Sequence, residues 1–125
     1  AKALGDILVV GVGNDAQVGK LKPGRPFHPD RWRQLIVASL KPVDFCFIGP
    51  PETIEHPLKI VELGFEVLKP DVYPIRYDTF DVSYRQGLAE RYGVKLAVLP
   101  RRDSSEFEAE EVTTTLIIER LRQAT

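Results

Sequence analysis

Three consecutive threonines near the end of the chain carry the hydroxyl groups with the clearest chemical use. Thr113, Thr114 and Thr115 precede residues 116–121, whose apolar members recur at helical spacing. Threonine is a usable N-cap, so the three residues predict where a helix starts. A helix start exposes unpaired N–H groups and the positive end of the macrodipole, which with hydroxyl donors would bind phosphate. A plain helix cap remains the alternative.

A basic segment in the first third of the chain is the second group of candidates. Arginine binds phosphate oxygens bidentately, and lysine binds them as a point charge. The net charge of the chain is −1, so a local basic rim favours a small anion over a nucleic acid. A solvated charged loop is the alternative. The rim comprises Lys20, Lys22, Arg25, Arg31 and Arg33, with Arg101 and Arg102 after the last predicted strand.

A glycine pattern after the first apolar run gives a weaker signal. Gly11, Gly13 and Ala16 fit the dinucleotide pattern GxGxxA, which needs a helix to open directly behind it. The glycines and prolines between residues 16 and 29 predict a loop there instead. A dinucleotide-dependent oxidoreductase therefore stays a minor alternative.

Other reactive side chains lack partners at useful spacing. His28 and His56 have no second ligand at metal spacing, so no protein metal site is expected. Ser104 and Ser105 have no partner histidine, and Cys46 stands in an apolar run as an inert core residue. This pattern is compatible with nucleotidyl transfer, which depends on positioning and charge stabilisation rather than on a nucleophilic side chain.

The elements that must position these groups alternate between strand and helix. Continuous apolar runs are typical of strands buried in a parallel sheet, so the alternation predicts an α/β fold. Strands are expected at residues 6–13, 44–48, 71–77 and 95–100, and helices at 29–40, within 52–68, at 83–92 and after 113. The first of these helices should bury Trp32, Leu35, Ile36 and Leu40.

The carboxyl ends of these strands should gather the candidate groups. Ligands of parallel sheets bind beyond those ends. The predicted rim therefore contains residues 13–15, the turn after Gly49, residues 76–78, and the segment from Arg101 to Thr113.

Length and composition describe one soluble domain. The 125 residues are 43% hydrophobic and 28% charged, which is ordinary for a globular protein. We find no membrane-spanning run and no signal peptide, so cytoplasmic localisation without a membrane partner is expected. Residues 1–6 are interpreted as the last turn of a helix with Gly5 in a left-handed conformation. This predicts that the sequence begins inside an element.

The motifs in their order resemble the cytidylyltransferase-like nucleotidyltransferases, with nearest similarity to heptose-1-phosphate adenylyltransferase and glycerol-3-phosphate cytidylyltransferase. The resemblance rests on residues 1–12, Asp15, Lys22, the Gly-Arg-Pro block at 24–26 with Arg33, the segment 68–72 followed by Asp78, and the closing signature at 112–121. It covers nearly the whole chain. It implies transfer of NMP from CTP or ATP to a phosphorylated small molecule, with Mg²⁺ and release of pyrophosphate, and it implies a homodimer.

The same resemblance assigns roles to individual residues. Lys22 matches the family's triphosphate-binding lysine and Thr114 a hydroxyl of the closing signature, so these two are the expected catalytic residues. The other expected nucleotide or phosphate contacts are Thr113, Thr115, Arg76, Asp78, Arg101 and Arg102, and the expected acceptor-side or supporting residues are Asp15, Arg25 and Arg33.

Several features depart from the family pattern. The family's Lys-Gly-Gly before the aspartate is replaced by Ile75, Arg76 and Tyr77, and residues 64–67 look like an insertion. The HxGH segment would lie upstream of Ala1, on the first and central strand of the family's Rossmann-like order 3-2-1-4-5. Residues 1–125 are thus expected to be one nucleotidyltransferase domain lacking that strand and helix. A non-catalytic nucleotide-binding module is the alternative.

Overall fold

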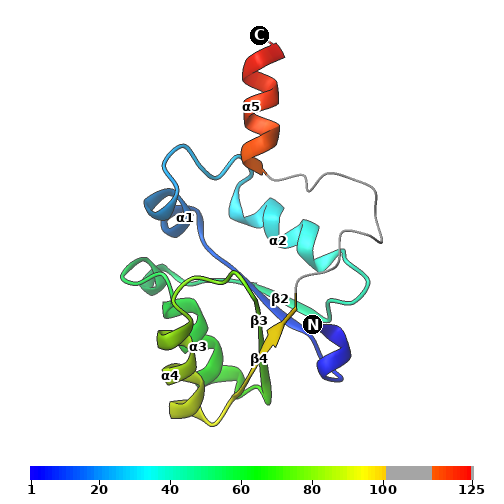
Figure 1. Ribbon diagram of the computed structural model, residues 1–125, viewed down its shortest axis with the longest axis vertical. Coiled ribbons are helices and arrows are strands. Elements are labelled where there is room, and N and C mark those ends of the chain that lie inside the picture. The colour runs from blue at the N-terminus through cyan, green and yellow to red at the C-terminus, as the bar shows by residue number, and fades with distance from the viewer. Residues whose placement is uncertain (101–113, 125) are drawn as a thin grey trace.

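Short parallel strands alternate with helices, as the sequence predicts. The computed structural model describes residues 1–100 and 114–124, and Figure 1 shows their arrangement. In chain order the elements are the 3₁₀ turn η1 (Lys2–Leu4), β1 (Val9–Val12), α1 (Asp15–Leu21), α2 (Asp30–Ala38), β2 (Phe45–Ile48), the 3₁₀ turn η2 (Pro51–Ile54), α3 (Lys59–Leu68), β3 (Val72–Arg76), α4 (Val82–Tyr92), β4 (Lys95–Leu99) and α5 (Thr114–Ala124).

The strands form two separate parallel pairs. β1 pairs with β2 in a register that runs from Val9 opposite Phe45 to Val12 opposite Ile48. β3 pairs with β4, with Val72 opposite Lys95 at the start. We expected a single sheet, but among the described residues these are two two-stranded sheets. In the family order 3-2-1-4-5, β1 to β4 would be the second to the fifth strand. The second strand then neighbours the third, and the fourth neighbours the fifth, which are the two pairs observed.

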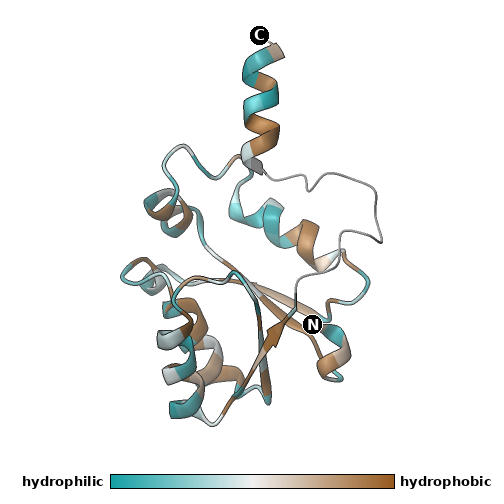
Figure 2. Cartoon of the chain, in the orientation of Figure 1, coloured by the Kyte–Doolittle hydropathy of each residue, from teal (hydrophilic) through white to brown (hydrophobic). Residues whose placement is uncertain are grey.

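The second strand pair and its helices enclose a small core. Phe65 of α3, Leu88 and Ala89 of α4, and Val94 are buried together, and strand residues such as Tyr73 pack against them. The rings of Phe65 and Tyr73 meet edge to face with centroids 5.1 Å apart, a favoured aromatic geometry. In Figure 2 the strand pairs are largely brown, and the outer turns of α4 are largely teal.

Several boundaries agree with the sequence prediction. The helix α4 ends at Gly93, which adopts the expected left-handed conformation with φ of 67°. The helix α3 ends at Leu68, as predicted, whereas the interruption considered at Gly64 does not occur. The helix α5 begins at Thr114, within the threonine run, and projects from the body of the molecule with its first turn nearest the body (Figure 1).

The predicted loop at residues 16–29 is wrong in its first part, because α1 forms there. Asn14 caps this helix: its side-chain oxygen accepts a hydrogen bond from the Gln17 N–H at 2.8 Å. The cap satisfies one of the N–H groups that a helix start leaves unpaired, which compensates for Gly19 inside the helix. The chain becomes irregular only after Leu21, where Pro23 follows.

The helix α2 lies where the sequence predicts it, but it turns a different face to the body. Trp32, Leu35, Ile36 and Leu40 were expected to be buried, yet all four are more than half exposed. The body-facing stripe is the neighbouring one, at Asp30, Arg33, Gln34 and Val37, which repeats at helical spacing. Polar contacts hold this stripe in place, including a hydrogen bond of 2.8 Å from Gln34 Nε2 to the Cys46 carbonyl.

The first residues differ from the expected helix end. Gly5 has φ of −168°, which is extended rather than left-handed backbone, and η1 is a single 3₁₀ turn. The segment is fastened by Asp44 at the start of β2, whose carboxylate accepts from Lys2 Nζ and, at 2.7 Å, from the Leu8 N–H. Both hydrogen bonds lower the pKa of Asp44, and the bond from Lys2 has the larger effect.

No helix in the described part of the chain is both long and apolar enough to cross a membrane.

Candidate active site

An open depression of about 330 Å³ lies at the carboxyl ends of β1 and β2. This is the place where parallel sheets bind ligands. Its walls come from the turn after β1, the start of α2 and the turn after β2, and its lining residues are Asn14, Asp15, Ala16, Asp30, Ile48, Gly49, Pro51 and Ile54. The sequence prediction for residues 13–15 and for the turn after Gly49 is therefore confirmed: they meet at one edge.

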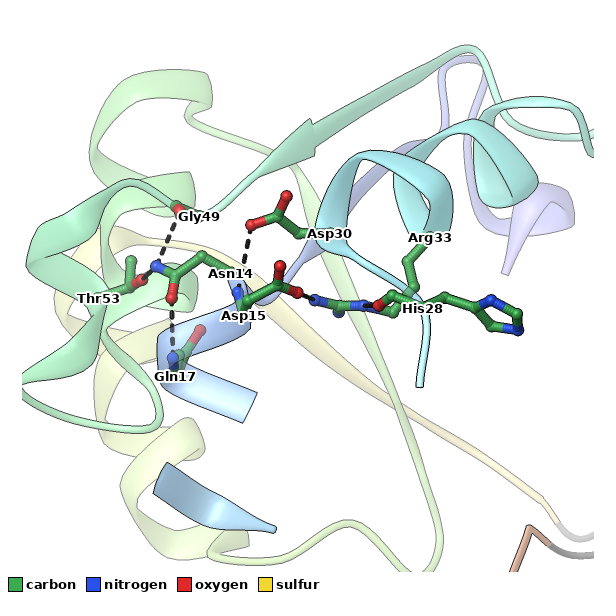
Figure 3. Close-up of polar contacts among 8 residues, drawn as sticks. All are labelled: Asn14, Asp15, Gln17, His28, Asp30, Arg33, Gly49 and Thr53. Atoms are coloured by element: carbon green, nitrogen blue, oxygen red, sulfur yellow. Dashed lines mark hydrogen bonds and ion pairs between the residues drawn. The ribbon is translucent and has the colours of Figure 1, made fainter. Parts of the chain in front are cut away.

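The Asn14 side chain joins the two strand ends (Figure 3). Its Nδ2 donates to the Gly49 carbonyl at 3.0 Å, to the Pro50 carbonyl at 3.0 Å and to Thr53 Oγ1 at 2.9 Å. Its Oδ1 caps α1 at Gln17. One carboxamide, on the turn that follows β1, thus contacts both α1 and the turn after β2.

Asp15 lies beside this junction in a polar network that links α1 to α2. Arg33 Nη2 donates to Asp15 Oδ1 at 2.8 Å, and Arg33 Nε donates to the His28 carbonyl at 3.0 Å. The Asp15 N–H donates to Asp30 Oδ2 at 3.2 Å. Asp15 and Arg33 thus form an ion pair that orients a carboxylate at the edge of the depression (Figure 3). The acceptor-side or supporting role expected of each stays a prediction.

The basic rim has an exposed part and a part held by contacts. Lys22 is exposed at the end of α1. Lys20 reaches toward η2, with its Nζ 3.3 Å from the Ile54 carbonyl. The Arg25 guanidinium lies over the Phe27 ring, 5.1 Å from its centroid, and Arg33 is engaged with Asp15.

The residues at the end of β3 form a separate pair. Arg76 contacts the Asp78 carboxylate with both Nε and Nη2 at 3.0 Å, and both side chains are about half exposed or more. We expected Arg76 to supply a cation and Asp78 a nucleoside contact. Their ion pair partly neutralises both charges, and both roles stay predictions. Neither residue is among those that line the depression beside Asn14.

A buried arginine fastens the segment that follows Asp78. Arg85 donates from Nε to the Phe80 carbonyl at 2.9 Å and also contacts the Tyr73 hydroxyl. Burial raises the pKa of Tyr73, and Arg85 partly opposes that rise. The segment at the end of β3 is thereby tied to the core.

Other predicted site residues lie at or beyond the limit of the structure. Arg101, Arg102 and Thr113 lie outside the described residues, and Thr114 is described only as the first residue of α5. Thr115 is exposed. Among the described residues there is no group of three His, Cys, Asp or Glu side chains that could hold a metal ion.

The glycine pattern has a packing explanation. A Cβ on Gly11 would lie 2.9 Å from Phe47 Cζ, and a Cβ on Gly13 would lie 3.0 Å from Gln17 Oε1. The helix that we considered absent does open behind the pattern, but the space beside both glycines is filled by side chains. These contacts favour a structural role for Gly11 and Gly13.

Sequence reasoning placed residues 13–15 at the rim but gave Asn14 no role of its own, and it missed Asp30 and Thr53 as parts of the site. An Asn directly after a strand, with Gln three residues later, is a helix-start signature that could have located Asn14 and α1. Thr53 and Asp30 carry no local signal, since their partners lie 39 and 15 positions away.

The comparisons with known proteins agree with this fold. No family model matches. FAD synthase of Ferroglobus placidus is 36% identical over 122 residues, which cover 97% of this chain and 73% of that protein. The bifunctional protein HldE of Pseudomonas syringae is 34% identical over 125 residues, and HldE of Helicobacter pylori is 32% identical over 124. The chain spans 23% of the length of these HldE proteins.

A solved structure is also similar. The crystal structure of the lipopolysaccharide core biosynthesis protein from Thermoplasma volcanium superposes with a TM-score of 0.60 at 27% identity, covering 82% of this chain and 78% of that one. The fold of most of this chain is thus similar to that of a solved protein of comparable length. The chain belongs to the cytidylyltransferase-like family and is a nucleotidyltransferase.

Proposed function

We propose that the protein moves the NMP group of ATP or CTP onto the phosphate of a small molecule, of the sugar phosphate or glycerol phosphate type, and releases pyrophosphate. The observation that carries this proposal is the Asp15–Arg33 ion pair at the edge of the depression beyond β1. The name of the FAD synthase relative supports an acceptor of this kind. FAD is FMN joined to AMP, so its synthesis also adds a nucleotide to a phosphate monoester.

The proposed reaction is an in-line displacement at the α-phosphorus. An oxygen of the acceptor phosphate forms a bond to that phosphorus, the bond to the bridging oxygen of the β-phosphate breaks, and pyrophosphate leaves with the electron pair. Because such reactions depend on positioning and charge stabilisation, fixed cations and donors suffice.

Three groups of this chain would act on the substrates. Lys22 supplies a mobile positive charge for the triphosphate from its exposed position at the end of α1. The α5 start at Thr114 supplies N–H groups and hydroxyls for the same phosphates. Asp15 and its partner Arg33 border the acceptor side.

A magnesium ion bound together with the nucleotide fits the residues present. Mg²⁺ in phosphoryl-transfer sites keeps several waters and binds substrate phosphates with one or two carboxylates rather than a full protein cage. The carboxylates of Asp15 and Asp30 both line the depression and would be the protein ligands. The ion would neutralise charge on the phosphates.

We further propose that the domain includes an upstream strand and the HxGH helix, as the resemblance implies. Within the described residues β1 and β3 each have a single strand neighbour, so each keeps an edge that another strand could pair. Amide exchange in the full-length protein tests this, since protection of those free edges is expected.

We also propose a homodimer, as the resemblance implies, and a cytoplasmic location. Light scattering would test the homodimer, and cell fractionation would test the location.

The activity test uses the full-length protein with ATP or CTP, each offered with FMN, glycerol 3-phosphate or a heptose 1-phosphate. We expect pyrophosphate release and a nucleoside-diphosphate conjugate with at least one pair. Lys22→Ala and Thr114→Val should each lower the rate about 10²-fold, the scale of one preorganised donor.

Matched variants control for unspecific damage. Lys41→Ala removes an exposed lysine outside the site, and Thr114→Ser keeps the hydroxyl, so both should retain activity. Pyrophosphate release that is unchanged in Lys22→Ala and in Thr114→Val would overturn the site assignment.

A further inference from the structure

Asn14 makes more hydrogen bonds than a helix cap needs. A cap requires only one side-chain oxygen that accepts a hydrogen bond from an N–H group in the first turn of the helix. Asn14 Oδ1 meets this need by accepting from the Gln17 N–H. The other half of the carboxamide has three acceptors from the turn after β2 within 3.0 Å of Nδ2. The side chain therefore ties together two chain segments that are 35 to 39 positions apart.

The surroundings dictate the orientation of this amide. The Thr53 hydroxyl is fully buried and donates to the Pro50 carbonyl at 2.6 Å, so its oxygen is left to accept from Asn14. A flipped amide would set Oδ1 against the Gly49 and Pro50 carbonyl oxygens and point Nδ2 at the Gln17 N–H donor, so these groups would lose their partners.

The place of Asp15 depends on this junction. Asp15 follows Asn14 directly, its N–H bonds to Asp30, and its carboxylate bonds to Arg33. The Gly49 N–H donates to the Val12 carbonyl at 2.8 Å, which continues the strand pairing up to the junction. Beyond that bond, the Asn14 side chain ties the turn that carries Asp15 to Gly49, Pro50 and Thr53 after β2.

We infer that Asn14, with Thr53 as its buried partner, is a positioning residue for nucleotidyl transfer: it holds the Asp15 carboxylate at the acceptor side of the depression. The inference rests on the proposed function, because the role of Asp15 belongs to it.

The cap and the bridge can be separated by substitution. Asn14→Ser keeps an oxygen for the cap but is too short to span to Gly49, whereas Asn14→Ala loses both functions. Thr53→Val removes the buried acceptor, and Thr53→Ser keeps it. Wild type, these four variants and the double variant N14S/T53V are compared in the full-length protein.

The kinetic readout uses ATP or CTP with FMN as the acceptor probe. Asn14→Ser and Thr53→Val should each lower kcat/KM for the acceptor by up to about 10²-fold, the scale of a misplacement of about 1 Å. The KM for the nucleotide should stay at its wild-type value, and Thr53→Ser should restore the rate. The double variant should be no worse than either single one, since both break the same bridge.

A second readout does not need turnover. In Asn14→Ser, NMR-detected amide exchange should become faster at Gly49 and Asp15, while Gln17 stays protected by the cap. Wild-type exchange at Gly49 and Asp15 in this variant would overturn the inference, whether or not the probe pair reacts. Active wild type with unimpaired Asn14→Ser and Thr53→Val would overturn it too, and would leave the proposed function standing. Inactive wild type counts against the proposed function alone.

Discussion

Arg33 on α2 holds the carboxylate of Asp15 on α1, with Nη2 2.8 Å from Oδ1. The arginine side chain is 21% exposed and is anchored a second time at the His28 carbonyl. A planar guanidinium held at two points has little freedom left. The pair therefore acts as a fixed link between two helices at the edge of the depression.

Replacement of either partner should impair catalysis more than stability. Asp15→Asn and Arg33→Lys each lose the paired geometry, and Arg33→Lys also loses the second anchor. We expect kcat/KM for the acceptor to fall by roughly 10-fold or more in each, because a positioned charge is lost. Steady-state kinetics measure the fall in kcat/KM, and thermal unfolding measures the change in stability. Arg91→Lys, at a 69% exposed side chain, serves as the control, and equal effects at both arginines would refute the assigned role.

Gly49 should not tolerate a side chain. A Cβ at this buried position would lie 2.9 Å from Ile60 Cδ1 and 3.1 Å from Thr53 Oγ1. Gly49→Ala should cost about 1–3 kcal/mol of unfolding free energy through overpacking. Gly87→Ala is the matched control. Its Cβ would meet nothing within 4 Å inside α4, so it should stabilise the protein by about 0.5–1 kcal/mol. Denaturant unfolding measures both, and a neutral Gly49→Ala would contradict the packing described.

Acid should release the first residues from β2. The pKa of Asp44 is lowered by its bonds to Lys2 and Leu8, so its ionised form stabilises the folded state. That contribution is complete above the unfolded pKa of about 3.9 and is lost as the pH falls through the lower folded pKa. An NMR titration should give a pKa for Asp44 below its ordinary value, and Lys2→Met should move it upward. An unchanged pKa in Lys2→Met would show that the ion pair is not its cause.

Cys46 should react slowly in the native protein. Burial raises the pKa of its thiol, and the thiolate is the reactive form. Alkylation by iodoacetamide near neutral pH should be slower than in urea and should accelerate as the pH rises. Mass spectrometry of the modified cysteine follows the reaction. Equal rates in native and unfolded protein would contradict this.

The half of the fold from β3 to β4 was predictable because its signals are local. The strands β3 and β4 are each marked by a short apolar run, and the end of α4 is marked by Gly93. Each of these signals lies within a few residues of the element that it predicts. Pro74 did not prevent β3 from forming, since β3 pairs on a single side within the described chain.

The candidate site was harder to predict because its contacts are long-range. Gly19 and Pro23 made residues 16–29 look like a loop, and the cap that outweighs Gly19 comes from Asn14. The helices α1 and α2 and the strand β2 all lie between Asn14 and its partners after β2 in the sequence. The rotation of α2 was equally hidden: its apolar residues marked the helix correctly, but hydrogen bonds by Arg33 and Gln34 decided which face lies against the strands.

That rotation gives the molecule a built-in optical probe. Trp32 is the single tryptophan of the sequence, and it stands 61% exposed on α2. Its indole is therefore solvated, and its emission should lie toward the red. Whatever covers α2, whether more of the same polypeptide or another subunit, would shift that emission to the blue and shield it from iodide quenching.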